Sequence, residues 1–276
     1  MTKNRDRYLI AIDLDGTLLT DKKKIRLKSK LFLRKLEKEG SIVAISTGRP
    51  VRTALPFYNE LKTHGPLLCY NGAYCFDPND SNFNVIRNPV SPTLIKKHYK
   101  YLIDNYADAA LSESLTTIYI DGEYHVFDFT LNYDNNLKMV EGSFDKTVNE
   151  DVYSFIMHTK YRDEKHVKEI KKYVERNLKG YCVDFWSDDW YFEVRKEGIN
   201  KAATIEKIQK LYKIPHENIL TFGDSTNDIQ LVSSFKNGYA MINGREHIKD
   251  FAKNITKKDN NHNGVVHEIK TYLKSH

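Results

Sequence analysis

Two short apolar runs near the N-terminus flank an amphipathic segment. Residues 8–12 (YLIAI) and 41–46 (SIVAIS) are typical of short strands that are buried on both faces. Between them, residues 29–39 place apolar side chains at helical spacing, namely Leu31, Phe32 and Leu36. The order strand, helix, strand predicts a βαβ unit and therefore a parallel sheet.

The pattern changes in the middle of the chain and then returns. Near the N-terminus a helix is expected over 52–61, and a strand, an Asn71-Gly72 turn and a second strand over 66–76. The middle predicts helices at 93–106 and 164–178, strands at 151–159 and 181–186, and a hairpin about Asp121-Gly122. The alternation of helices and strands that predicts a parallel sheet resumes with a helix at 201–212, a strand at 218–224, a helix at 227–235 and a strand at 239–242.

This arrangement predicts an α/β protein with a discontinuous parallel-sheet core. The core is expected over residues 1–86 and 191–276, and an α+β insert with an antiparallel sheet over 87–190.

Three of the predicted parallel strands end in polar, glycine-containing turns, "IDLDGT", "ISTGRP" and "FGDSTND". Ligands bind at the carboxyl ends of such strands, so these turns should meet in one crevice. The crevice would hold four carboxylates, from Asp13, Asp15, Asp224 and Asp228. Such crowding raises pKa values unless a hard cation relieves it, and Mg²⁺ is the cation that suits this site best.

These residue types fit phosphoryl transfer. Asp13 can act as the nucleophile, and Asp15 can protonate the leaving group and then activate water. The hydroxyl of Thr47, the N–H of Gly48 and the charge of Lys201 can hold phosphate oxygens. Each motif taken alone also fits a structural turn, a solvated helix position or a helix N-cap at Ser225 or Thr226.

Four segments in this order, "DLDGTLL", "ISTGR", "NKAATI" and "GDSTNDIQLV", resemble motifs one to four of the haloacid dehalogenase superfamily, specifically its Cof-type subfamily IIB. The resemblance implies a Rossmann-like core, a mobile α+β cap that supplies specificity contacts, and magnesium-dependent phosphoester hydrolysis through a phosphoaspartate. It implies a metal held by the side chains of Asp13 and Asp224 and the carbonyl of Asp15. Asp228 would be a further ligand or a partner of Lys201. Phosphate would be bound by Thr47 and Lys201, with help from Asn71 and Asn227.

Two departures from the family pattern are visible. Ala202 follows the lysine where glycine is usual, and Ile242-Asn243-Gly244 replaces a glycine-asparagine-alanine loop. Neither departure touches the proposed chemistry. Because Asp15 is present, phosphatase or phosphomutase chemistry is favoured over the dehalogenase and transport-ATPase branches. A phosphomutase and a non-catalytic regulatory protein on the same scaffold remain the alternative functions.

Composition narrows the class of protein. The 276 residues carry a formal net charge of +6, and the densest basic cluster, Lys22-Lys23-Lys24, is read as solvated surface. A nucleic-acid partner is therefore not expected. The three cysteines fit a reducing compartment, and neither a signal peptide nor a membrane span is expected. We predict a cytoplasmic protein, a monomer or weak homo-oligomer, whose partner is a small phosphate ester.

Three further features have simpler interpretations. "DNNHNG" (259–264) begins like a calcium loop but has Lys270 where glutamate is required, so a polar turn at the crevice rim is expected. His158 is interpreted as a structural histidine. Trp186 and Trp190 are interpreted as packing residues of the insert, with a role in a substrate pocket as the alternative.

Overall fold

The computed structural model describes residues 7–128, 138–161, 163–186 and 191–275. The chain divides into two compact units. Unit 1 comprises Met1–Arg49, Ala54–Ile86 and Asn200–His276, and unit 2 comprises Pro50–Thr53 and Arg87–Ile199. None of the described helices is long and apolar enough to cross a membrane.

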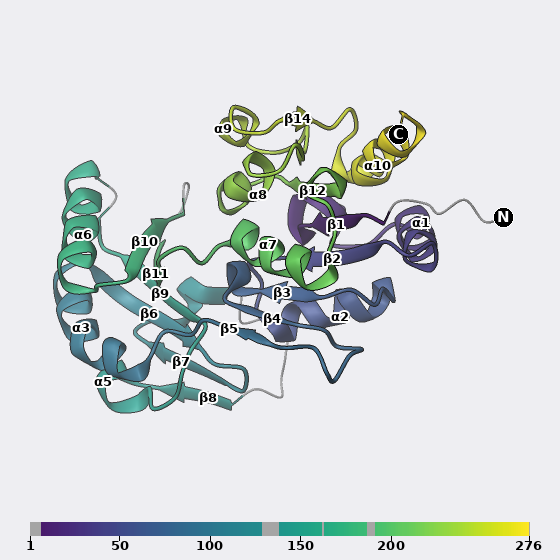
Figure 1. The fold of residues 1–276 in the computed structure, drawn as a ribbon. Coiled ribbons are helices and arrows are strands. Elements are labelled where there is room, and N and C mark those ends of the chain that lie inside the picture. The colour runs from purple at the N-terminus through teal and green to yellow at the C-terminus, as the bar shows by residue number, and fades with distance from the viewer. Residues whose placement is uncertain (1–6, 129–137, 162, 187–190, 276) are drawn as a thin grey trace. The chain divides into compact units, whose positions relative to one another are not determined.

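Unit 1 is built on a sheet whose described part has eight strands in the order β14-β13-β12-β1-β2-β3-β4-β5 (Figure 1). The strands are β1 (Leu9–Ile12), β2 (Ile42–Ser46), β3 (Leu67–Cys69), β4 (Tyr74–Phe76), β5 (Ile86–Arg87), β12 (Ile219–Gly223), β13 (Asn237–Ala240) and β14 (Asn254–Ile255). All pairings from β14 through β12, β1 and β2 to β3 are parallel, and β4 is antiparallel to β3. The predicted α/β class with a parallel-sheet core is confirmed.

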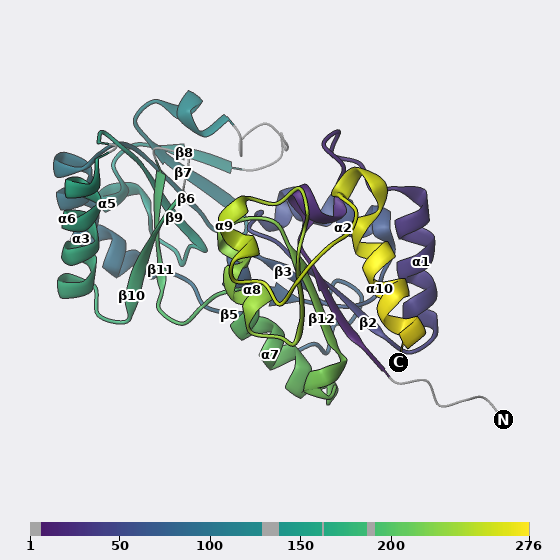
Figure 2. The same ribbon diagram turned by 90° about the horizontal axis from the view of Figure 1, so that it is seen from above.

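Helices cover both faces of this sheet. Figure 2 shows α1 (Leu27–Lys38) and α10 (Gly264–Ser275) on one side of β12, β1 and β2, and α7 (Lys201–Tyr212) and α8 (Ile229–Ser233) on the other. Because side chains alternate along a strand, Leu9 and Ala11 pack with Ile205 and Leu231 on the α7 and α8 side. The remaining elements of unit 1 are most of α2 (Val51–Leu61), whose first residues belong to unit 2, α9 (Glu246–Lys249), and the short turns of helix Leu14–Leu18, Tyr70–Gly72, His216–Asn218, Thr226–Asp228 and Asn260–His262.

The helix predicted over 29–39 is present as α1, but one of the three apolar side chains that indicated it, Leu31, faces solvent. Leu33 and Leu36 are buried, whereas Leu31 is 57% exposed. Leu33 and Leu36 are three residues apart and share a helix face, and Leu31 lies on a different face. Phe32 is half-buried, and Nζ of Lys270 lies 4.8 Å from its ring centroid.

Unit 2 has a sheet whose described strands are ordered β10-β11-β9-β6-β7-β8. The strands are β6 (Ala107–Glu113), β7 (Thr117–Asp121), β8 (Lys138–Glu141), β9 (Ser154–Thr159), β10 (Tyr181–Phe185) and β11 (Tyr191–Lys196). The helical elements are α3 (Pro92–Asn105), a 3-10 turn at Tyr124–Phe127, α5 (Phe144–Thr147) and α6 (Glu164–Asn177). The core includes Tyr99 of α3, Phe144 of α5 and Val174 of α6, packed with Phe155 of β9.

Three expectations for this unit need correction. The hairpin joins β6 to β7 through residues 114–116, and after Asp121 the chain enters the 3-10 turn instead of returning. The sheet is mixed, because β7 and β8 are parallel. Residues 191–196, which were expected in the core domain, form β11, and this strand pairs with β10 and β9.

The side chains singled out in the insert have packing contacts within unit 2. His158 lies with Nδ1 2.5 Å from Oδ1 of Asp108 and packs edge-on against Tyr191. Trp186 packs against an apolar cluster that includes Ile118 and Phe127. Trp190 lies outside the described residues.

Candidate active site

The site begins where β1 ends. All four residues of β1 are buried, and the N–H of Asp13 extends the ladder by donating to the carbonyl of Phe222, 3.1 Å away. The chain then makes a single wide helical turn over Leu14–Leu18, in which Gly16 has a φ of +68°. A Cβ at Gly16 would lie 2.3 Å from Oδ2 of Asp224. Glycine is therefore required both for the turn and for the close approach of Asp224.

Two more aspartates come from the end of β12, the strand next to β1. Asp224 follows the strand directly, and its Oδ1 accepts a hydrogen bond from the hydroxyl of Thr17 at 3.0 Å. Asp228 is buried and its Oδ2 accepts the backbone N–H groups of Asp224 and Ser225 at 3.1 and 3.3 Å. The turn after β12 is thus held by the carboxylate that it presents.

Lys201 joins these carboxylates from the first residue of α7. The side chain of Asn200 caps this helix by accepting the N–H of Ala203 at 2.9 Å. Lys201 is fully buried, and its Nζ donates to Oδ1 of Asp13 at 2.7 Å and to Oδ1 of Asp228 at 2.5 Å. Burial disfavours the ammonium ion, but the two carboxylates outweigh this and raise the pKa of Lys201.

Asp13, Asp224 and Asp228 form an acidic cluster, with one carboxylate oxygen of each within 4.8 Å of the others. Burial raises the pKa of Asp13 well above its usual range; Lys201 opposes this rise, and the neighbouring carboxylates add to it. Burial and the nearby Asp228 raise the pKa of Asp224 to about 7. This cluster can hold a metal ion, whose positive charge would remove the electrostatic conflict.

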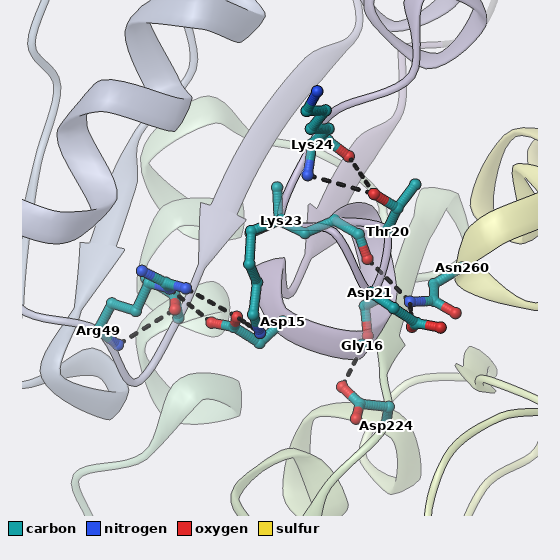
Figure 3. A network of polar contacts seen from close by, with 12 residues as sticks. Asp15, Gly16, Thr20, Asp21, Lys23, Lys24, Arg49, Asp224 and Asn260 are labelled. Atoms are coloured by element: carbon teal, nitrogen blue, oxygen red, sulfur yellow. Dashed lines mark hydrogen bonds and ion pairs between the residues drawn. The ribbon is translucent and has the colours of Figure 1, made fainter. Parts of the chain in front are cut away.

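Asp15 lies outside that cluster, which corrects the expectation that four carboxylates pack together. Its Oδ2 accepts Nε of Arg49 at 2.5 Å, and its Oδ1 accepts Nη2 of Arg49 at 2.8 Å and Nζ of Lys23 at 2.6 Å (Figure 3). Burial alone would raise the pKa of Asp15, but its hydrogen bonds with Arg49 and Lys23 lower it. Two cations thus neutralise the charge of Asp15.

The residues expected to bind phosphate also come together in unit 1. The side-chain amide of Asn227 donates to Oδ1 of Asn71 at 2.8 Å. A Cβ at Gly48 would lie 3.0 Å from that oxygen and 3.1 Å from Nδ2 of Asn227. Thr47 joins this group through its carbonyl, which accepts the N–H of Asn71 at 3.1 Å.

Sequence reasoning missed several residues at this site. The sequence predicts Lys23 as solvated surface and gives Arg49 no role, yet both side chains bond Asp15. Thr17 was not singled out, although it is buried and bonds Asp224. Asn243 was noted only as a departure in a loop, yet its Nδ2 donates to the carbonyl of Gly16 at 2.7 Å. Arg49 and Thr17 each belong to a strand-end motif, "ISTGRP" and "IDLDGT", and that placement is the signal in the sequence that could have found them.

Comparisons with known proteins agree with this geometry. A sequence model of the family described as haloacid dehalogenase-like hydrolase matches residues 10–269. The 5-amino-6-(5-phospho-D-ribitylamino)uracil phosphatase YitU of Bacillus subtilis is 32% identical over 271 residues, covering 96% of this chain and 97% of that protein. The pyridoxal phosphate phosphatase YbhA of Escherichia coli is 27% identical and covers 96% and 98% of the two chains.

Solved structures share the fold. A haloacid dehalogenase-like hydrolase from Bacteroides thetaiotaomicron superposes with a TM-score of 0.78 at 23% identity, covering 97% of this chain and all of that chain. A sugar phosphatase of subclass IIB superposes with a TM-score of 0.77 at 20% identity, covering 96% and 98%. The family match over most of the chain, together with YitU, confirms the resemblance seen in the four motifs. This chain therefore belongs to the haloacid dehalogenase-like hydrolases, and within that family it is a phosphatase.

Proposed function

We propose that this protein is a magnesium-dependent phosphatase that hydrolyses small phosphate monoesters through an aspartyl phosphate on Asp13. The observation that carries the proposal is the arrangement around Lys201, whose Nζ bonds both Asp13 and Asp228 beside Asp224. A nucleophilic carboxylate, a fixed cation and a group of hard oxygen donors are the components that phosphoryl transfer requires.

The donor set fits Mg²⁺. Among the described residues, Oδ2 of Asp13 and Oδ2 of Asp224 accept no hydrogen bond, so each can serve as a ligand. Both oxygens of Asp228 are engaged, by Lys201 and by two backbone N–H groups, which favours a role in positioning Lys201. The carbonyl of Asp15 would complete the protein ligands. When bound, the ion would neutralise charge on the phosphoryl oxygens and relieve the repulsion between the carboxylates.

The residues of the chain account for both chemical steps. The Asp13 carboxylate attacks phosphorus and the ester P–O bond breaks, while Asp15, in its protonated form, gives its proton to the departing oxygen. Because Arg49 and Lys23 favour the carboxylate and lower the pKa of Asp15, its protonated form is a stronger acid than an unpaired aspartic acid. Lys201, Thr47 and the N–H of Gly48 would hold the phosphoryl oxygens, with Asn71 and Asn227 at the edge of that site. Asp15 then takes a proton from water as the water attacks phosphorus, and phosphate leaves Asp13.

The Asp13→Asn variant tests the proposal. We expect phosphate release to fall by at least about a thousandfold, because the amide cannot act as the nucleophile, while far-UV circular dichroism stays unchanged. Acid-quenched wild-type enzyme should yield a phosphorylated peptide that contains Asp13, and the variant should not. Turnover in the variant, after contamination is excluded by a repeat preparation, would rule out Asp13 as the nucleophile.

The substrate class rests on the relatives. YitU and YbhA carry names that specify small metabolite phosphates. We therefore rank 5-amino-6-(5-phospho-D-ribitylamino)uracil first in a screen, followed by pyridoxal 5′-phosphate and hexose phosphates, each measured with Mg²⁺ and with a chelator. YitU and YbhA are phosphatases by name, so they give no support to the alternative of a phosphomutase. Isomerised sugar phosphate as the main product would favour the mutase.

A further inference from the structure

The short loop after the β1 turn presents Lys23 to Asp15. Leu19 and Ile25 form an antiparallel bridge, and the N–H of Thr20 donates to the carbonyl of Lys24 at 3.0 Å. Between them Lys23 has a φ of +53°. Figure 3 shows the Lys23 side chain running back to Asp15, while the side chain of Lys24 points away from it. The side chains of these two adjacent lysines therefore point in different directions, and that of Lys23 points to Asp15.

A second turn, residues 259–263, fastens this loop. Asp21 accepts Nδ2 of Asn260 on Oδ1 at 2.9 Å and Nδ2 of Asn261 on Oδ2 at 2.7 Å. The N–H of Asp21 donates back to Oδ1 of Asn261 at 3.2 Å. Asn260 is buried and also donates to the carbonyl of Leu19 at 3.0 Å. Asn260 and Asn261, in the segment that begins like a calcium loop, therefore form hydrogen bonds with the loop that carries Lys23.

The turn at residues 259–263 is also connected, through Asn243, to the helical turn Leu14–Leu18 that contains Asp15. The N–H of Asn260 donates to Oδ1 of Asn243 at 3.0 Å, and Nδ2 of Asn243 donates to the carbonyl of Gly16. Gly16 follows Asp15 directly. Both the backbone and the side-chain partner of Asp15 are thus set from residues near the C-terminus of the chain.

The contacts of Asp15 select one of its oxygens. A carboxylate oxygen has two lone pairs, and those of Oδ1 are filled by Lys23 and by Nη2 of Arg49. Oδ2 accepts only Nε of Arg49 among the described residues, so it keeps one position open. A group that passes a proton must lie within hydrogen-bond reach of the reacting oxygen, and misplacement by about 1 Å costs on the order of a hundredfold.

We propose that Lys23 is a positioning residue for the leaving-group step, held in place by the amides of Asn260 and Asn261. This inference rests on the proposed function of Asp15. Lys23 fills the second lone pair of Oδ1, so that Oδ2 is the oxygen that meets the substrate. The ion pair is partly exposed, with 50% of the Lys23 side chain and 38% of the Asp15 side chain accessible. Pairs of this kind contribute little to stability, so the effect should appear in kinetics.

The test compares two aryl esters that differ in their need for a proton. Nitrophenolate leaves readily as an anion, whereas phenolate is more basic and gains more from general acid catalysis. We expect Lys23→Met to lower kcat/KM about tenfold for phenyl phosphate and less than about twofold for p-nitrophenyl phosphate, with an unchanged melting temperature. Lys24→Met makes the same charge change in the same loop and should leave both esters unaffected.

A second variant tests the fastening turn. Asn261→Ala should show the same selective loss for phenyl phosphate, but smaller. The double variant Lys23→Met/Asn261→Ala should be no worse than Lys23→Met, because both changes act through one contact. Equal losses for the two esters would overturn the inference, since they would indicate a substrate-binding or structural role. Additive losses would overturn the link to Asn261. Failure of the proposed function looks different, because wild type and Lys24→Met would then also lack magnesium-stimulated hydrolysis.

Discussion

Replacing Lys201 by methionine removes a buried cation that bonds both Asp13 and Asp228. At an effective dielectric constant of about 20, a unit charge 2.7 Å from another gains about 6 kcal/mol, and the desolvation of each ion costs several kcal/mol. In the group of Asp13, Lys201 and Asp228, the attraction between opposite charges and the cost of desolvation therefore nearly cancel. Loss of the lysine leaves two buried carboxylates without a counter-charge. We expect the free energy of unfolding of the metal-free protein to fall by about 3–5 kcal/mol.

The assay is urea denaturation followed by far-UV circular dichroism, with a chelator present. Lys207→Met, an exposed change on the same helix, is the matched control and should cost less than about 0.5 kcal/mol. The double variant Lys201→Met/Asp228→Asn should regain part of the loss, because one uncompensated charge is gone. Trp186 packs against an apolar cluster of unit 2, so its fluorescence is a reference for that unit. A loss below about 1 kcal/mol, or no recovery in the double variant, would refute the reasoning.

Two further predictions concern the acidic cluster. Because the pKa values of Asp13 and Asp224 are raised on folding, the metal-free folded protein keeps protons that the unfolded chain releases, so its stability should fall as the pH rises from about 4 to about 7. Mg²⁺ competes with these protons and should raise the melting temperature more at pH 8 than at pH 5; equal shifts would contradict this account. Gly16→Ala should lower kcat by at least about a hundredfold, because its Cβ would displace Asp224. Gly180→Ala is the control: its φ is +79° with no atom within 4 Å of the added Cβ, so it carries backbone strain alone, and similar effects of the two variants on activity would exclude the clash.

Some features of this protein follow from local sequence. The apolar runs of β1, β2 and β12 are too short for helices and too apolar for exposed strands, so they predict a buried parallel sheet. Asp13 and Asp224 directly follow two of these strands, and neighbouring parallel strands bring their carboxyl ends together. The fold class and the pairing of these two aspartates could therefore be predicted.

Other features depended on tertiary structure. Leu31 and Leu33 have the same chemistry, and only the packing of α1 decides that Leu33 is buried. The hairpin signal at Asp121-Gly122 was overridden because β7 pairs on its other edge with β8, in parallel. Such outcomes depend on which surfaces meet, and local propensity does not contain that information.

Within the site, too, some features follow from local sequence and others from tertiary structure, as the partners of Asp15 show. Local sequence placed Asp15 beside Asp13 and Gly16 at the turn. Lys23 reaches Asp15 from a loop in which Asp21 is bonded by an amide 240 positions along the chain, and Lys201 meets Asp13 across 188 positions. Sequence determined which chemical groups the strand ends carry. The folded chain decided which charges face one another, because such contacts form only once distant segments are packed side by side.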